Sequence, residues 1–100
     1  MKYQRIIDYI KSDSYFVTSH ARNRMAEREI STSQLEDAIL CGEIIESYEG
    51  DLPCPSYLLL STANNISPHI VIGMCKDHLR IITCYYPDEN EWINYRERRQ

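Results

Sequence analysis

Three basic side chains recur at helical spacing near the start of the chain. His20, Arg24 and Arg28 stand four residues apart in the segment HARNRMAERE, and this spacing lines them up along one face of a helix. A histidine can take or give a proton near neutral pH. An arginine guanidinium is a planar fork that binds two phosphate oxygens at once. The pattern therefore indicates acid–base chemistry on a phosphate group.

A second polar group is expected on two neighbouring strands, in the apolar runs PHIVIGMC and LRIITCY. If a three-residue turn joins these strands, His69 lies opposite Tyr85. The same register places Gly73 opposite Ile81. Thr83 shares the face of Tyr85, because alternate residues of a strand point the same way. His69, Thr83 and Tyr85 are therefore expected together at one end of the sheet, on the face away from the helices.

These side chains are the parts needed to cleave an RNA phosphodiester bond without a metal ion. A general base takes the proton of the 2′-hydroxyl, guanidinium groups stabilise the charge that grows on phosphorus, and a general acid protonates the departing 5′-oxygen. We therefore predict six catalytic residues, which are His20, Arg24, Arg28, His69, Thr83 and Tyr85. No cofactor is implied. A metal site is disfavoured because the spacing offers no helix or turn pair of ligands.

Each of these residues also has an ordinary structural interpretation. Arg24 can pair with Glu27 on a solvated helix face, which is the usual fate of such a charge pattern. His69 can be a hydrogen-bonded histidine of the core. Thr83 and Tyr85 are residue types that commonly pack in sheets. Both interpretations remain open from the sequence.

Charge is distributed unevenly along the chain. The 15 acidic and 11 basic residues give a net charge of -4, which argues against an indiscriminate polyanion binder and gives no reason to expect DNA as a ligand. Residues 31–60 carry six acidic side chains and no basic one, and every basic residue comes before Glu29 or after Cys75. A local basic site is therefore expected where the two ends of the chain meet.

The cysteines indicate a cytoplasmic protein with free thiols. Cys41, Cys54, Cys75 and Cys84 include no C-x-x-C pair, so a closed zinc site is a poor interpretation. Arg5 and Asp8 stand where a signal peptide would have its apolar core, and a reducing compartment is therefore expected. No run approaches the roughly 20 apolar residues of a membrane span.

The hydrophobic pattern predicts one domain over residues 1–100. Three helices are expected: one with a buried stripe of Tyr3, Ile6, Ile7 and Ile10, one from Thr18 or Ser19, and one from the capping box of Ser31 and Gln34 to Gly42. Four strands are expected over Glu43–Tyr48, Tyr57–Thr62, Pro68–Cys75 and Leu79–Tyr85. The predicted fold class is α+β, with N-terminal helices packed on a four-stranded antiparallel sheet.

Four segments carry, in the same order, a resemblance to a known family. SHARNRMAEREIS, AILCGEIIESY, PHIVIG and IITCYYPDENEW resemble the bacterial domain of unknown function number 4258, over about Tyr15 to Arg99. The resemblance implies a RelE-like, BECR-type fold similar to RelE-like and BrnT-like toxins, with helices flanking a curved antiparallel sheet. The chain has Glu29 where the family tends to have glycine, which suggests a different helix ending. It has Tyr86 where a charged residue is common, which weakens a phosphate contact from the last strand.

The resemblance also implies a function. The chain is expected to be a toxin of a type II toxin–antitoxin system that acts as a metal-independent endoribonuclease of the mRNA interferase type. Its partners would be RNA and a cognate antitoxin protein, with no membrane. A function of another class also fits the sequence, namely a non-catalytic protein-interaction module of the same fold. The net charge of -4 favours that alternative, because ribosome-directed nucleases are commonly basic.

Overall fold

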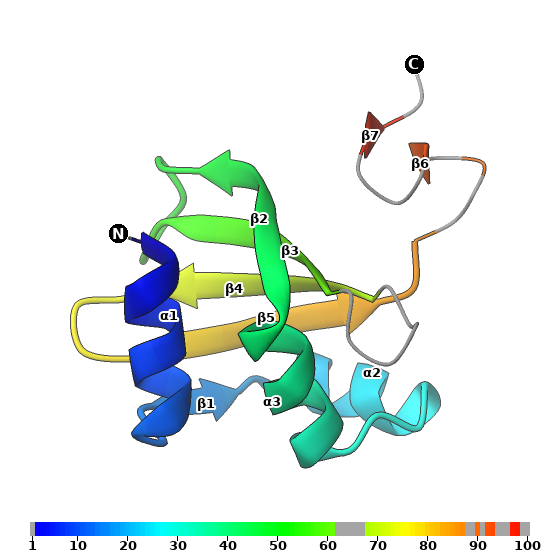
Figure 1. Ribbon diagram of the computed structural model, residues 1–100, viewed down its shortest axis with the longest axis horizontal. Coiled ribbons are helices and arrows are strands. Elements are labelled where there is room, and N and C mark those ends of the chain that lie inside the picture. The colour runs from blue at the N-terminus through cyan, green and yellow to red at the C-terminus, as the bar shows by residue number, and fades with distance from the viewer. Residues whose placement is uncertain (1, 62–67, 88–89, 91, 94–96, 99–100) are drawn as a thin grey trace.

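The computed structural model describes residues 2–61, 68–87, 90, 92–93 and 97–98, and Figure 1 shows the course of the chain. Its helices are α1 (Lys2–Lys11), α2 (Ser19–Glu27) and α3 (Thr32–Leu40). Its strands are β1 (Tyr15–Val17), β2 (Gly42–Tyr48), β3 (Ser56–Ser61), β4 (His69–Met74), β5 (Leu79–Tyr85), β6 (Trp92–Ile93) and β7 (Glu97–Arg98). The predicted α+β class is confirmed.

The helices form where apolar residues recur at the helical period. In α1, Ile6 and Ile10 are buried on one stripe. Ahead of α3, the Ser31 hydroxyl accepts a hydrogen bond from the Gln34 backbone N–H at 3.1 Å. The Gln34 side-chain carbonyl accepts one from the Ser31 N–H at 2.9 Å. This predicted capping box is confirmed, and it pairs N–H groups that have no partner inside the helix.

Five strands form one mixed sheet in the order β1-β5-β4-β3-β2. The four strands β2 to β5 pair antiparallel, as predicted. The expectation of a sheet with four antiparallel strands alone is wrong, because β1 adds a fifth strand that runs parallel to β5. A strand of three residues is too short to show the alternation that identifies strands in a sequence. The predicted last residue of β3, Thr62, lies outside the described residues.

The register of β4 and β5 matches the prediction at one end and differs at the other. His69 lies opposite Tyr85, as predicted, but Gly73 lies opposite Arg80 and not Ile81. The difference arises because Ile82 is an extra residue in β5 and forms a bulge. The sheet face that carries His69 and Gly73 is called the outer face below. The bulge brings Arg80 onto the outer face with Tyr85.

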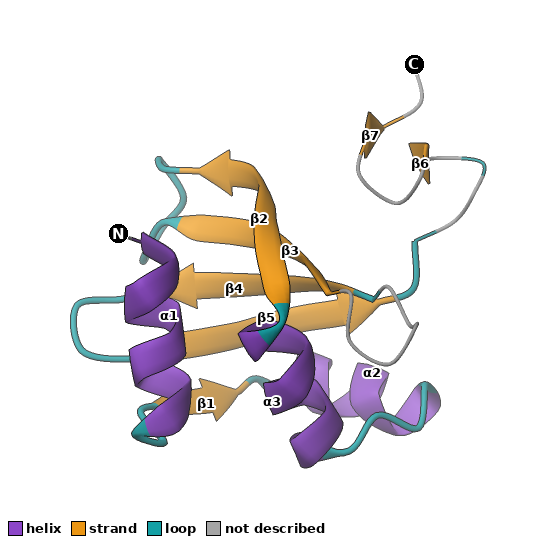
Figure 2. Ribbon diagram, viewed as in Figure 1, coloured by secondary structure: helices purple, strands orange, loops and turns teal. Residues whose placement is uncertain are grey.

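The helices and the sheet enclose the core on the other face of the sheet. Figure 2 shows α1 and α3 on one side of the sheet, and α2 after β1 beside β5. On β4, Ile70, Ile72 and Met74 point into this core. The core cluster consists of Ile6, Ile10, Ala21, Met25, Leu35, Ala38, Ile39, Tyr57, Leu59, Ile70, Ile72, Met74, Leu79, Ile81 and Cys84. The fold therefore holds α2 and β5 together through shared core residues.

A disulfide joins the loop after β2 to the end of β4. Cys54 and Cys75 are bonded, with their Cα atoms 5.1 Å apart and a sequence separation of 21. The expectation of four free thiols is therefore wrong, although Cys41 and Cys84 are not disulfide-bonded. The sequence could not show the pairing, because it depends on how the β2–β3 loop folds over the β4–β5 turn.

The C-terminal segment adds a small second sheet. Trp92 pairs with Arg98 and Ile93 pairs with Glu97 in an antiparallel arrangement. The sequence pattern did not predict these two short strands. In the described part of the chain, no helix has the length and apolar character needed to cross a membrane.

Candidate functional site

The start of α2 is attached to β5. Thr18 is the N-cap, and its hydroxyl oxygen accepts a hydrogen bond from the Ala21 N–H at 3.1 Å. The same hydroxyl donates to the Ile82 carbonyl at 3.0 Å. The Thr18 N–H donates to the Ile81 carbonyl at 3.1 Å. Of the two predicted caps, Thr18 is the one used, and these bonds fix the position of α2 beside β5.

The end of α2 is closed by a residue in the left-handed backbone region. Glu29 has a φ of 57°. Its N–H donates to the Ala26 carbonyl at 3.3 Å, and the Ile30 N–H donates to the Met25 carbonyl at 2.8 Å. These two bonds form a Schellman motif, which usually has glycine at this position. The expectation of a different helix ending is therefore wrong, because Glu29 adopts the conformation that glycine favours.

The three predicted basic residues lie along one face of α2 and its C-cap Arg28, and we call them the basic face (His20, Arg24 and Arg28). Arg24 donates to the Glu27 carboxylate at 3.3 Å, so the expected solvated ion pair is present. Such a half-exposed pair contributes less than about 1 kcal/mol. The His20 and Arg28 side chains are exposed and form no hydrogen bond or ion pair with any described residue. They are therefore available to a ligand.

The positive charges of Arg24 and Arg28 affect the pKa of a buried thiol in β5. Cys84 is fully buried in the core. Burial raises the pKa of its thiol, and the positive charges of Arg24 and Arg28 lower it in part. Both guanidinium groups therefore contribute a positive potential at the C-terminal end of β5. A thiol with a raised pKa is a poor nucleophile, and Cys84 is a buried residue of the core.

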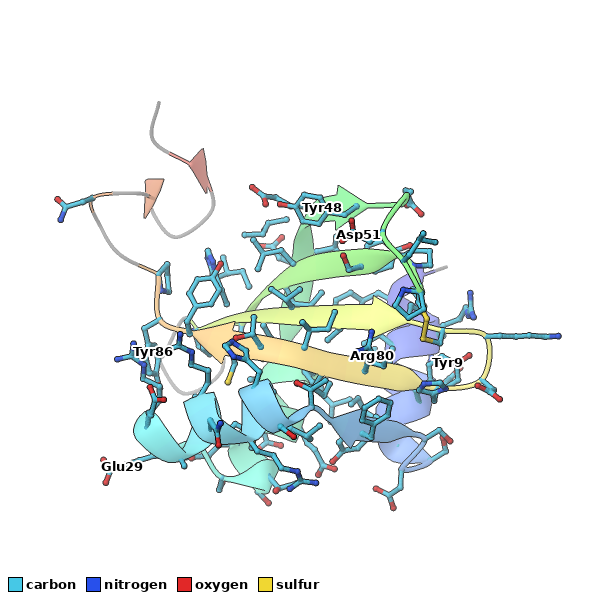
Figure 3. All side chains as sticks on the ribbon, turned by 180° about the vertical axis from the view of Figure 1, so that it is seen from behind. Tyr9, Glu29, Tyr48, Asp51, Arg80 and Tyr86 are labelled. Carbon is cyan, nitrogen blue, oxygen red and sulfur yellow. A yellow bond between two sulfur atoms is a disulfide. The ribbon has the colours of Figure 1, made fainter. Side chains whose placement is uncertain are left out.

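A cavity of about 260 Å³ opens where α2, α3 and the ends of the central strands meet. Ile30, Leu35 and Ile70 belong to its apolar wall, and Arg28 and Tyr86 also line it. Figure 3 shows Tyr86 and Glu29 at the same end of the molecule, with the Glu29 side chain pointing outward. The cavity thus combines an apolar wall with one guanidinium, one carboxylate from Glu29, one phenol and the polar side chains of Gln34 and Ser61.

The other three predicted residues gather on the outer face of the sheet. The His69 Nδ1 atom lies 3.2 Å from the Tyr85 hydroxyl, and their rings meet edge to face with centroids 5.3 Å apart. Thr83 is opposite Val71 on the same face. His69 is fully buried, whereas Thr83 and Tyr85 are half-buried. The predicted meeting of these side chains is confirmed, and their catalytic role stays a prediction.

The six predicted residues therefore fall into two groups. The basic face lies on α2, and His69, Thr83 and Tyr85 lie on the sheet. Of the six, Arg28 alone lines the described cavity. Sequence reasoning missed Tyr86, whose side chain is 40% exposed and lines the cavity. The sequence signal that could have identified Tyr86 is its position directly after Tyr85, one of the six predicted residues. In the part of the chain that the structure describes, no group of three His, Cys, Asp or Glu side chains could hold a metal ion.

The fold and site define a class of small α+β domain, with a mixed sheet and a basic helix face beside a cavity. The family model described as Domain of unknown function (DUF4258) matches residues 17–86, and the chain belongs to this family. The matched segment contains all six predicted residues and Tyr86. No curated protein and no solved structure matched the chain.

Proposed function

We propose that the protein is a metal-independent endoribonuclease of the toxin type, with a RelE-like fold, that binds RNA at the basic face and the cavity. One observation supports this most. Arg28 lines the cavity and forms no ion pair with any described residue. A guanidinium without a carboxylate partner favours an anionic ligand such as phosphate. The apolar wall beside it suits a flat nucleobase.

The proposed reaction is attack of a ribose 2′-oxygen on the adjacent phosphorus. The new bond joins the 2′-oxygen to phosphorus, and the bond from phosphorus to the 5′-oxygen breaks. A base takes the 2′-hydroxyl proton and an acid gives a proton to the leaving oxygen. His20, which is exposed on the basic face, performs one of these transfers. Arg24 and Arg28 stabilise the charge on the phosphate oxygens.

The outer-face residues have a supporting part in this proposal. His69 is fully buried, so it acts by holding the Tyr85 hydroxyl through their hydrogen bond. Tyr85 and Thr83 are half-buried and can contact an RNA that crosses the outer face. His69 is then a positioning residue, and His69→Gln should lower cleavage to about the same extent as Tyr85→Phe.

The proposed substrate also implies a cellular compartment and a partner protein. A protein that cleaves messenger RNA works in the cytoplasm, where the Cys54–Cys75 disulfide would be largely reduced. Cleavage in the presence of a reductant is therefore part of the proposal. A cognate antitoxin would inhibit the enzyme by covering the basic face.

The test is cleavage of RNA by the full chain in the presence of EDTA and a reductant. Free and ribosome-bound messenger RNA are the substrates, and a strand with 2′-deoxy sugars is the chemical control. We expect wild-type cleavage with a 2′,3′-cyclic phosphate end and no cleavage of the deoxy strand. His20→Ala should reduce the rate by about 100-fold or more. Arg22→Gln, an exposed arginine on another face of α2, should leave it unchanged.

One observation favours the alternative of a non-catalytic interaction module. The second histidine, His69, is buried in a hydrogen bond and does not reach solvent, which leaves His20 as the exposed acid–base group of the predicted six. The cleavage assay separates the two functions. Failure to cleave any RNA, free or ribosome-bound, together with co-purification of a partner protein, would establish the interaction module and overturn the nuclease proposal.

A further inference from the structure

A second cluster of aromatic and basic side chains lies at the other end of β5 from the cavity. Phe16 of β1 pairs with Arg80 of β5, and the Arg80 Cζ atom lies 5.8 Å from the centre of the Phe16 ring. The ring centres of Phe16 and His78 are 5.5 Å apart, with a tilt of 31°. We call Phe16, His78 and Arg80 the aromatic cluster.

The aromatic cluster is open to solvent. The Phe16 side chain remains 47% exposed although Arg80 and His78 both contact it. Arg80 forms no ion pair with any described residue. Asp77 is the acidic neighbour in the adjoining turn, and it accepts a hydrogen bond at 2.8 Å from His78 when the ring nitrogen Nδ1 is protonated. Lys76 is exposed in the same turn, so this end of the sheet carries the positive charges of Lys76 and Arg80 together with the carboxylates of Asp77 and Asp13.

The bulge at Ile82 places this cluster on the same side of the sheet as the outer-face residues. Arg80 lies opposite Gly73, and Tyr85 lies opposite His69, two pairs that share the outer face. Figure 3 shows Arg80 and Tyr86 toward the two ends of β5 in one view. These two residues are six positions apart, which corresponds to about 20 Å along a strand. A single strand of several nucleotides spans this length, passing from the outer face round the C-terminal end of β5 to the cavity.

We infer that the aromatic cluster is a second contact for single-stranded RNA, and this inference rests on the proposed function. Unpaired bases stack on exposed aromatic rings and on arginine planes, and their phosphates are attracted to the nearby cations. A duplex keeps its bases stacked inside the helix and cannot use Phe16 in this way. The cluster therefore binds a single strand whose other end lies at the basic face and the cavity.

The test compares two lengths of RNA in a binding assay. Fluorescence anisotropy is measured with 2′-O-methyl RNA of ten and of two nucleotides, which lacks the attacking hydroxyl and is not cleaved. We expect Phe16→Ala and Arg80→Gln each to weaken binding of the longer RNA about 10-fold and to leave the shorter one unchanged. Arg28→Gln should weaken binding of both. Tyr48→Ala removes an aromatic side chain that is 40% exposed on β2, and it should change neither.

The outcomes separate this inference from the proposed function. Unchanged binding of the longer RNA by both Phe16→Ala and Arg80→Gln, with loss of binding in Arg28→Gln, would overturn the second contact and leave the proposed function intact. A wild-type protein that binds neither RNA would overturn both. Circular dichroism of each variant checks that it folds. Arg80→Gln keeps the Phe16 ring in place and so tests the cluster even if Phe16→Ala fails to fold.

Discussion

Replacing Glu29 with glycine should stabilise the protein. Glu29 closes α2 with a φ of 57°, a conformation in which a β-carbon costs about 1–2 kcal/mol. Glycine avoids that cost, but its greater freedom in the unfolded chain costs roughly 0.5–1 kcal/mol. The difference predicts a gain of about 0.5–1 kcal/mol for Glu29→Gly. Urea titration measures this gain, and thermal unfolding should show a rise of a few degrees, at about 4–8 °C per kcal/mol.

Two variants separate the backbone effect from other effects at this position. Glu29→Ala removes a carboxylate from the negative end of the helix dipole but keeps the β-carbon, so its gain should be smaller. Asp13 also has a φ of 57°, but aspartate tolerates this conformation better than glutamate. Asp13→Gly should therefore stabilise less than Glu29→Gly. A Glu29→Gly variant no more stable than Glu29→Ala would refute the proposed backbone cost at this position.

Three further predictions concern the disulfide, a tyrosine of α1 and the buried thiol. Cys75→Ser opens the 21-residue loop closed with Cys54 and should lower the free energy of unfolding by about 3 kcal/mol in urea without reductant; a loss under 1 kcal/mol would contradict this. Burial raises the pKa of Tyr3 to about 12, above about 10 in the unfolded chain. The contribution of this shift to the free energy of unfolding is therefore full below pH 10 and is lost as the pH rises to 12. Tyr3→Phe should flatten the dependence of the free energy of unfolding on pH in that range. Arg28→Gln should raise the pKa of Cys84 in an NMR titration, and a lowered pKa would count against the placement of the charge.

Local patterns in the sequence predicted the helices well. The capping box at Ser31 and Gln34 involves neighbours three residues apart, so it can be read directly and it is present. The way α2 ends at Glu29 was harder to predict, because glutamate disfavours a left-handed backbone conformation. The Schellman bonds and the packing of Ile30 outweigh that local preference.

Features that depend on distant partners could not be predicted. The strand β1 has only three residues and exists because β5 lies beside it. The bulge at Ile82 changes which residue lies opposite Gly73, and no local signal marks it. The bond between Cys54 and Cys75 needs the folded loop to bring the two residues together.

The candidate site was predicted in part. Helical spacing gave the basic face, and strand alternation with a short turn gave the meeting of His69 and Tyr85. The sequence could not say that His69 is fully buried, since a histidine beside apolar residues can be either a ligand-binding or a core residue. Nor could it show the cavity, which forms only where Arg28 and Tyr86 meet the core.

The proposed function depends most on the binding of RNA phosphates by Arg24 and Arg28. Its most direct test is the affinity of the double variant Arg24→Gln, Arg28→Gln for a fluorescent single-stranded 2′-O-methyl RNA, measured over a range of salt concentrations, with Arg22→Gln as the control. We expect weaker binding in the double variant only, with a slope of log affinity against log salt that is smaller by about 1.4. Equal affinity and slope in the wild type and the double variant would contradict it.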